Sequence, residues 1–273
     1  MTERLMLIGS PVAHSKSPAI HQIFGTQTGL TVQYEARAVE ADAVESVVRE
    51  FFATGGRGMN ITVPHKEQVF TLVDRLTPEA QQARAVNTLW MESGTLVGHN
   101  TDGLGLLDDL DRLALPMTGQ RLLVLGAGGA IAGCLGPLMA RGPARVTLVN
   151  RTLARAQAIA DRFPGIDVLP FEALSSFDAP IDGVISGLSS GLTGVWDVPL
   201  PTQCLSSTTW CYDLVYQATA TPFVMACRPF TDRCYDGFGM LVGQAARAFS
   251  AWFDCPVDPW QAYRQLRPHG QPV

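Results

Sequence analysis

The chain has 273 residues, of which 47% are hydrophobic and 16% charged. This composition excludes an intrinsically disordered protein, and the length suffices for one large domain or two ordinary ones. The formal net charge is −5, and no stretch of the sequence concentrates Lys or Arg. Because nucleic-acid binding normally requires a basic face, we expect no nucleic-acid partner.

The cysteines, histidines and apolar runs narrow the class of protein further. The six cysteines form no C-x-x-C pair, so we expect reduced thiols packed as small apolar side chains. The five histidines lack metal-binding spacing, which predicts no metal site. The N-terminus lacks a signal-peptide pattern, and no segment approaches the ~20 apolar residues of a membrane span. We therefore expect a cytoplasmic protein with no membrane partner.

Short strands and helices alternate through the first hundred residues, which predicts a mainly parallel sheet with helices on both faces. Ser17 is predicted as the N-cap of the first helix and Pro18 as its first residue. The turn at residues 92–94 predicts a hairpin. The expected elements are strands at 5–8, 33–38, 59–63, 87–91 and 95–97 and helices at 18–29 and 41–52.

A second unit is predicted from about Thr101, with the pattern of a doubly wound, Rossmann-type dinucleotide-binding sheet. Its expected elements are helices at 104–113, 130–140 and 152–163 and strands at 121–125, 146–149, 168–169, 183–185 and 209–212.

The chain ends in helices, and the helix at 238–253 carries apolar residues at helical spacing. We expect this helix to pack back on the first unit, which would make that unit discontinuous. The prediction is a substrate-binding and catalytic domain of residues 1–101 plus 238–273, and a dinucleotide-binding domain of residues 102–237.

A glycine-rich turn follows the strand at 121–125. Gly126 permits the tight turn, and Gly128 lets the backbone approach a pyrophosphate at the start of the next helix. The third glycine of the full fingerprint is replaced by Ile131, and a glycine loop without a ligand is the alternative interpretation. The strand–turn–helix context favours the dinucleotide site. The predicted phosphate-binding residues are Gly126, Ala127, Gly128, Gly129 and Ala130.

The residues after the strand at 146–149 indicate which dinucleotide is bound. An NAD enzyme usually has a carboxylate there, about 20 residues beyond the glycine turn, to hold the ribose 2′-hydroxyl. Here the sequence is Asn150, Arg151 and Thr152, with Arg155 one helical turn further. A guanidinium binds a 2′-phosphate with two hydrogen bonds, whereas a cation at a helix start is otherwise unfavourable. These residues favour NADP over NAD, with a solvated arginine pair as the alternative.

Hydride transfer from an alcohol also needs a proton acceptor beside the reacting carbon. Lys66 and Asp102 both follow predicted strands, whose carboxyl ends face the ligand cleft of an open α/β sheet. The alternatives are a surface lysine and a turn or cap aspartate. Ser15 and Ser17 are spaced to donate two hydroxyl hydrogen bonds to a carboxylate, or else Ser17 serves only as a cap.

Taken together, these motifs resemble the signature set of shikimate dehydrogenases over nearly the whole chain. The residues that carry the resemblance lie at 14–18, 60–67, 85–88, 100–103, 126–130, 150–152, 212–213 with Tyr216, and 236–241 with Gln244. The resemblance implies NADP-dependent, reversible reduction of 3-dehydroshikimate to shikimate in chorismate and aromatic amino acid biosynthesis. It implies a monomer or homodimer with a small-molecule substrate.

The resemblance also implies roles for individual residues. Lys66 and Asp102 would be the catalytic pair, with Lys66 as the proton shuttle. Gln244 lies on the apolar face of the last long helix, where a polar group requires a partner. Ser15, Ser17 and Tyr216 would hold the substrate carboxylate, Thr62, Asn87, Asp102 and Gln244 would bind the ring hydroxyls, and Leu214 and Gly237 would contact the cofactor.

Some positions depart from the family pattern. Residues 186–191 replace the family's Asn-Ala-Thr-Ser-Ser-Gly, and His65, His99 and Phe238 replace the usual Phe, Asp and Leu. Two alternatives stay open: a dehydrogenase that prefers quinate or uses NAD, and a non-catalytic NADP-binding regulator on the same fold.

Overall fold

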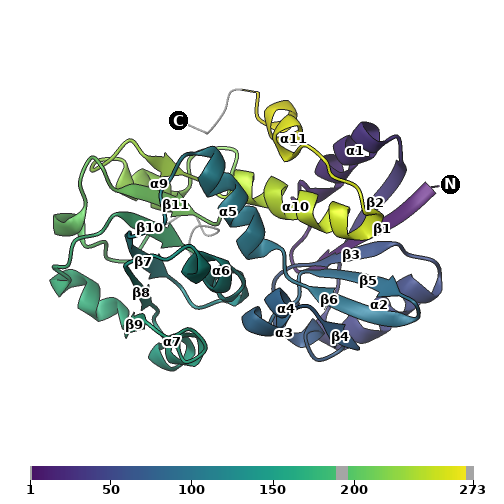
Figure 1. Cartoon of the computed structure of the whole chain (residues 1–273), viewed down its shortest axis with the longest axis horizontal. Coiled ribbons are helices and arrows are strands. Elements are labelled where there is room, and N and C mark those ends of the chain that lie inside the picture. Colours follow the sequence, from purple (N-terminus) through teal and green to yellow (C-terminus); the bar gives the residue numbers. More distant parts are fainter. Residues whose placement is uncertain (1, 189–195, 269–273) are drawn as a thin grey trace.

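The computed structural model describes residues 2–188 and 196–268. Two six-stranded sheets lie side by side, and the long helices α5 (Asp102–Arg112) and α10 (Phe238–Phe253) run between them (Figure 1). The α/β class with two mostly parallel sheets is confirmed. No helix within the described ranges is long and apolar enough to cross a membrane. All six cysteines are free thiols, as predicted.

The first sheet has the strand order β2-β1-β3-β5-β6-β4. Strand β5 runs antiparallel to both of its neighbours, and the other pairs are parallel. The predicted strand at 59–63 is too long, because the amide of His65 donates to Thr62 O at 3.1 Å and closes a turn. The strands are β1 (Thr2–Gly9), β2 (Thr31–Ala38), β3 (Gly58–Ile61), β4 (Arg75–Leu76), β5 (Thr88–Glu92) and β6 (Thr95–His99).

Two helices of the first unit begin differently from the prediction. Ser17 is not the N-cap of its helix: Lys16 has that position, already in the right-handed region, and the Ser17 amide donates to Ser15 Oγ at 3.2 Å. Residues 41–43 form a 3₁₀ turn ahead of the second helix. The helices are α1 (Ser17–Thr28), α2 (Val44–Ala53), α3 (Lys66–Val69) and α4 (Pro78–Ala83).

The second sheet is parallel throughout, in the order β12-β11-β10-β7-β8-β9. This is the doubly wound arrangement, in which ligands bind beyond the carboxyl ends of the strands where the order reverses, here between β7 and β10. The strands are β7 (Arg121–Leu125), β8 (Arg145–Val149), β9 (Ile166–Leu169), β10 (Gly183–Ser186), β11 (Trp210–Asp213) and β12 (Cys234–Tyr235). The helices are α6 (Gly129–Ala140), α7 (Leu153–Ala160) and α9 (Pro222–Cys227), with 3₁₀ turns at Phe171–Ser176 and Thr202–Cys204.

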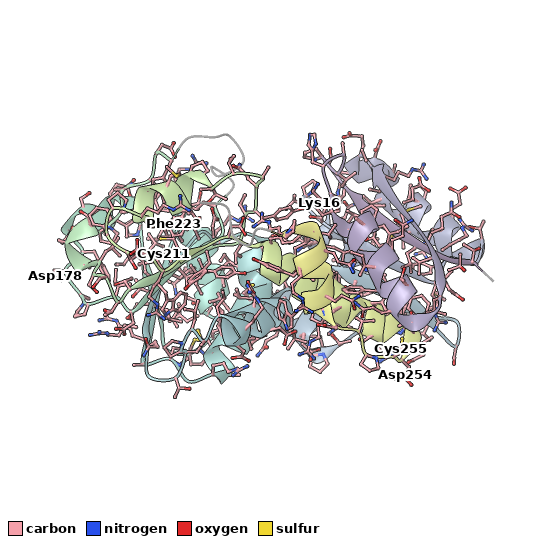
Figure 2. The ribbon with its side chains drawn as sticks, turned by 90° about the horizontal axis from the view of Figure 1, so that it is seen from above. Lys16, Asp178, Cys211, Phe223, Asp254 and Cys255 are labelled. Carbon is pink, nitrogen blue, oxygen red and sulfur yellow. The ribbon has the colours of Figure 1, made fainter. Side chains whose placement is uncertain are left out.

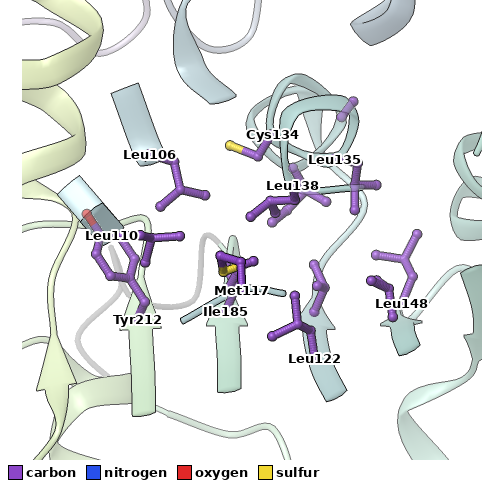
Figure 3. Close-up of a cluster of buried hydrophobic side chains, with 14 of the residues drawn as sticks. Leu106, Leu110, Met117, Leu122, Cys134, Leu135, Leu138, Leu148, Ile185 and Tyr212 are labelled. Atoms are coloured by element: carbon purple, nitrogen blue, oxygen red, sulfur yellow. The ribbon is translucent and has the colours of Figure 1, made fainter. Parts of the chain in front are cut away.

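Helix α5 packs on the second sheet and helix α10 packs on the first unit. Leu106 and Leu110 of α5 join the buried cluster with α6 and strands β7, β8, β10 and β11 (Figure 3). Val242 and Phe249 of α10 pack against Phe24 of α1, and helix α11 (Pro259–Leu266) covers the same cluster. This packing supports the predicted division at residues 102 and 238, which stays a prediction.

Helices α5 and α10 cross in close backbone contact. A Cβ at Gly105 would overlap the backbone nitrogen of Gln244, and a Cβ at Gly243 would lie 2.8 Å from Gly105 O. The two glycines therefore fix how far Gln244 lies from the start of α5.

We predict that Gly105→Ala lowers the free energy of unfolding by about 1–3 kcal/mol, because the backbone of α10 cannot yield to an added methyl group. Helix propensity alone would raise stability by roughly 0.5–1 kcal/mol. The matched control is Gly136→Ala in α6, where the atoms nearest to the added Cβ belong to the end of the flexible Gln82 side chain. Urea unfolding of both variants gives the sign, and a stabilised Gly105→Ala variant would contradict the prediction.

Candidate active site

Lys66 and Asp102 form a closely spaced ion pair. Lys66 is the first residue of α3 and Asp102 is the first residue of α5. Lys66 Nζ lies 2.6 Å from Asp102 Oδ2, and the two side chains are only 12% and 6% exposed. The turn after β3 and the turn after β6 thus bring together an ammonium and a carboxylate that are 36 positions apart in sequence. A buried pair of this kind can hold and transfer a proton.

The second oxygen of Asp102 is held by Asn87. Asn87 Nδ2 donates to Asp102 Oδ1 at 2.8 Å, and the Asp102 amide donates to Asn100 Oδ1 at 3.0 Å. Asn87 and Asn100 are both 2% exposed. The Asp102 carboxylate is therefore fixed by the Asn87 hydrogen bond on one oxygen and by the ammonium on the other, and its backbone is held by Asn100.

Gln244 of α10 reaches the same cluster. Its Oε1 accepts from Thr101 Oγ1 at 3.3 Å and lies 3.5 Å from Asn87 Nδ2, while its Nε2 donates to Leu241 O at 2.8 Å. The partner that the sequence required for Gln244 is thus supplied by both the backbone and the polar cluster. The structure places Asn87, Asp102 and Gln244 together, as the prediction requires, while their contacts with a substrate stay predictions.

Three hydroxyl side chains lie around the turn before α1. Ser15 and Ser17 flank Lys16, whose backbone amide donates to the Tyr216 hydroxyl. Burial raises the pKa of Tyr216, so the phenol stays protonated at neutral pH. Lys16 itself is exposed, on the side of the first unit that faces the second (Figure 2). Thr62 lies just beyond the end of β3, where its amide donates to Ile8 O at 2.9 Å. The hydroxyls of Ser15 and Tyr216 can donate to a carboxylate without adding charge to the site, whereas the Ser17 side chain hydrogen-bonds the Tyr34 hydroxyl.

The glycine turn after β7 lies opposite Lys66. Gly126 has φ 105°, a value that L side chains rarely adopt. A Cβ at Gly129, the first residue of α6, would lie 3.8 Å from Lys66 Cβ, whereas a Cβ at Gly128 would meet nothing within 4 Å. The space in front of Gly128 and the first amides of α6 form a cradle that fits a pyrophosphate. Ala127 and Ala130 complete the turn, and Ile131 is buried in the core rather than facing this space.

The residues after β8 lie at the rim of the second sheet. Asn150 Nδ2 donates to Thr152 O at 2.9 Å, which holds the turn that precedes α7. Arg151 is exposed. Arg155 Nη2 lies 3.3 Å from Glu67 Oε1, so this predicted cofactor residue pairs with the residue that follows Lys66. Both partners are more than half exposed, and an ion pair of this kind is weak.

Leu214 and Gly237 adjoin each other at the end of β11. The Leu214 amide donates to Ser186 O at 2.7 Å, and a Cβ at Gly237 would overlap the carbonyl group of Leu214. Leu188 lies against the glycine turn, since a Cβ at Gly126 would be 3.1 Å from Leu188 Cδ2. The segment 186–191, whose sequence departs from the family pattern, therefore begins beside the cradle. Its residues 189–191 lie outside the described residues.

The two unusual histidines bond to groups outside the ion pair. His65 Nε2 lies 2.7 Å from Val39 O, and His99 Nδ1 lies 2.7 Å from Thr77 Oγ1. Burial lowers the pKa of His99, and the nearby Glu79 opposes that shift.

Sequence reasoning missed several polar residues beside the site, namely the partly buried Tyr34 and the buried Asn60, Thr88 and Thr101. Asn60, Thr88 and Thr101 lie inside the motifs that carry the family resemblance, which is the signal that could have found them. Tyr34 lies within a strand whose pattern gives no such signal.

A doubly wound sheet whose glycine cradle faces a buried lysine–carboxylate pair defines a class of protein, the nicotinamide-dependent dehydrogenases of alcohols and ketones. Comparisons with known proteins specify the family within this class. Residues 7–89 match the model of the shikimate dehydrogenase substrate binding domain, and residues 110–194 match that of shikimate / quinate 5-dehydrogenase. The chain belongs to the shikimate dehydrogenase family.

Individual relatives cover the full length. A shikimate dehydrogenase (NADP(+)) from Alkalilimnicola ehrlichii is 45% identical over 100% of this chain and 97% of its own length. One from Cellvibrio japonicus is 41% identical over 100% of this chain and 96% of its own length. Among solved structures, the shikimate 5-dehydrogenase from Thermus thermophilus in complex with NADP(H) and shikimate is 33% identical. It has a TM-score of 0.84 and covers 96% of this chain and 99% of that one.

We predict that Gly128→Ala weakens NADPH binding at least tenfold and leaves the melting temperature within about 1 °C of the wild type. The backbone at Gly128 has φ −91° and ψ 175°, which alanine adopts freely, and the new methyl group touches no protein atom. It would occupy the space into which the pyrophosphate must fit. Fluorescence titration with NADPH measures the effect, and unchanged affinity would contradict this placement of the cofactor.

Proposed function

We propose that this chain reduces 3-dehydroshikimate to shikimate with NADPH, reversibly, in chorismate and aromatic amino acid biosynthesis. The single observation that carries the proposal is the 2.6 Å pair of Lys66 Nζ and Asp102 Oδ2 opposite the Gly126–Ala130 turn. The family and the NADP-dependent names of the full-length relatives support it. So does the Thermus thermophilus structure, whose ligands are NADP(H) and shikimate.

Residues of this chain donate and accept the proton that accompanies hydride transfer. The nicotinamide, when bound, supplies or accepts the hydride. Lys66 Nζ donates a proton to the ring carbonyl oxygen during reduction and takes it back from the hydroxyl during oxidation. Asp102 Oδ2 holds the ammonium in place, and its other oxygen is fixed by Asn87.

The substrate would lie between two sets of polar residues, one for its carboxylate and one for its ring hydroxyls. Its carboxylate would be held by Ser15, Ser17 and Tyr216, and the contact of the Tyr216 hydroxyl with the Lys16 amide supports that grouping. Its ring hydroxyls would bind Thr62, Asn87, Asp102 and Gln244. The links of Gln244 with Thr101 and Asn87 support this second group.

The cofactor would lie across the second sheet. Its pyrophosphate would rest on Gly126, Ala127, Gly128, Gly129 and Ala130, and its nicotinamide half would pass Leu214 and Gly237. The adenosine 2′-phosphate would bind Arg151, with Asn150, Thr152 and Arg155 around it. Arg155 would exchange its contact with Glu67 for the phosphate at little cost, because that ion pair is exposed.

Two alternatives are distinguished by one assay. Initial rates with shikimate and quinate, each with NADP and NAD, separate the proposed activity from a quinate-preferring or NAD-using dehydrogenase. Dinucleotide binding without turnover would indicate the non-catalytic regulator. The proposal includes a location in the cytoplasm, a compartment that keeps thiols such as those of this chain reduced. It also includes action as a monomer or homodimer.

We predict that Lys66→Met lowers kcat for shikimate oxidation by roughly 10²–10⁴-fold, the usual contribution of a general acid–base group. KM should change only a few-fold, because the substrate-binding hydroxyls remain. The control is Arg49→Met, which removes an exposed cation of α2 in the same unit. Wild-type turnover by the Lys66→Met variant would exclude the proposed role.

We predict that Arg151→Ala raises KM for NADP by about 10–100-fold, the loss expected for charge-assisted hydrogen bonds. KM for NAD should stay nearly constant, because NAD lacks the 2′-phosphate. Arg145→Ala, which removes an exposed arginine paired with Asp167 at the start of β8, serves as the control. Equal effects on both cofactors would place the 2′-phosphate elsewhere.

A further inference from the structure

A chain of hydrogen-bonded side chains, all buried except the partly buried Tyr34, connects the turn before α1 with the catalytic carboxylate. It begins at Ser17, whose side chain hydrogen-bonds the Tyr34 hydroxyl. Tyr34 lies 2.8 Å from Asn60 Oδ1, and Asn60 Nδ2 lies 3.2 Å from Thr88 Oγ1. Thr88 Oγ1 lies 2.8 Å from Asn87 Oδ1, and Asn87 Nδ2 donates to Asp102 Oδ1. The chain crosses the first sheet from β2 through β3 to β5.

Backbone groups fix which way both amides of this chain point. Asn60 Nδ2 also lies 3.1 Å from the carbonyl oxygen of Asn87, which can only accept, so the nitrogen of the Asn60 amide must face it. Asn87 Oδ1 lies 2.9 Å from the amide nitrogen of Thr101, which can only donate, so the oxygen of the Asn87 amide must face that amide.

These two constraints determine every donor in the chain. The Tyr34 hydroxyl must donate to Asn60 Oδ1. Thr88 Oγ1 accepts from Asn60 Nδ2, so its own proton goes to Asn87 Oδ1. Asn87 Nδ2 is then left to donate, to Asp102 Oδ1 at 2.8 Å and also to Thr101 Oγ1 at 2.9 Å. All hydrogen bonds therefore run in one direction, from Tyr34 to the carboxylate, and such aligned bonds polarise and strengthen one another.

The surroundings keep the donors protonated and the chain in place. Thr88 is fully buried, and Asn60 is 5% exposed. Burial raises the pKa of Tyr34, so its hydroxyl remains a donor at neutral pH. The Tyr34 ring stacks on His21 at 4.4 Å between centroids, and burial lowers the pKa of His21 to about 4. His21 is therefore neutral at neutral pH and adds no charge beside the chain.

We infer that Tyr34 and Thr88 are positioning residues, which act through Asn60 and Asn87 to hold the Asp102 carboxylate toward Lys66. They need not touch the substrate for this. Without the Thr88 hydroxyl, Asn87 Oδ1 keeps only Thr101 as a hydrogen-bond partner. The Asn87 amide is then held less firmly, and so is the donor to the Asp102 oxygen that does not face Lys66. This inference rests on the proposed function, because its readout is the turnover of shikimate.

The test compares three single variants and one double variant in shikimate oxidation with NADP. Thr88→Val preserves volume and removes the hydroxyl, and it should lower kcat roughly tenfold, the effect of one buried hydrogen bond left unmade. Tyr34→Phe should lower kcat a few-fold. Thr88→Ser restores the hydroxyl and should recover most of the kcat lost in Thr88→Val.

The double variant separates a connected chain from two independent packing sites. Because Thr88→Val already interrupts the chain, adding Tyr34→Phe should lower kcat by little more than Thr88→Val alone. Independent contributions would instead multiply. The control is Thr209→Val, which removes another buried, hydrogen-bonded threonine hydroxyl in the second unit and should lower stability without changing kcat. The dissociation constant of NADPH should remain unchanged in all variants.

Each outcome decides the question. The inference would be overturned if the losses of kcat in the double variant multiplied, or if Thr88→Ser were as slow as Thr88→Val. It would also be overturned if kcat were unchanged in both Thr88→Val and Tyr34→Phe. Wild-type turnover of shikimate, measured first, tests the proposed function separately. An inactive wild type would overturn that function and this inference together. An active wild type in which the two substitutions lower kcat independently would overturn only the inference.

Discussion

The buried contact between Lys66 and Asp102 is the interaction on which the site depends. Removing two opposite charges from water is costly, and their attraction offsets the cost only with close geometry and satisfied remaining lone pairs. The structure provides both, through the 2.6 Å contact on one carboxylate oxygen and the Asn87 donor on the other. Asp102 also lies in the first turn of α5, where the helix dipole favours a negative charge, whereas Lys66 begins the short α3. The carboxylate thus stabilises a cation that the local helix does not.

Close helix packing ties this pair to the cofactor cradle. A Cβ at Gly103 would lie 2.5 Å from Gly133 O in α6, so the first turn of α5 lies directly on the helix that begins at the glycine turn. Gly105, two residues further, lies equally close to α10 and so fixes Gln244. One helix therefore sets three distances at once: from the ion pair to the cradle, from the ion pair to Gln244, and from the first sheet to the second. Small residues at these positions are a requirement of the site as much as of the fold.

The sequence predicts those parts of the molecule that depend on local chemistry. The glycine turn, the arginine after β8 and the residues at the ends of β3 and β6 follow from patterns within a few positions of each residue. The start of α1 differs from the prediction because serine is a preferred cap residue by type, whereas the helix begins at Ser17 and the backbone of Lys16 is already helical. Strands β4 and β12, of two residues each, are too short to leave a pattern.

The contribution of Tyr34 and Thr88 shows a different limit of sequence reasoning. Asn60 and Thr88 are register partners in the antiparallel pair of β3 and β5, and that pairing depends on the strand order of the whole sheet. Residue 34 reaches Asn60 across β1, since β2 is not a direct neighbour of β3. No local pattern encodes these relations. Polar residues inside a sheet are costly unless every donor finds an acceptor. A buried polar row in which all donors run toward one catalytic carboxylate is therefore better explained by the need to orient that carboxylate than by stability alone.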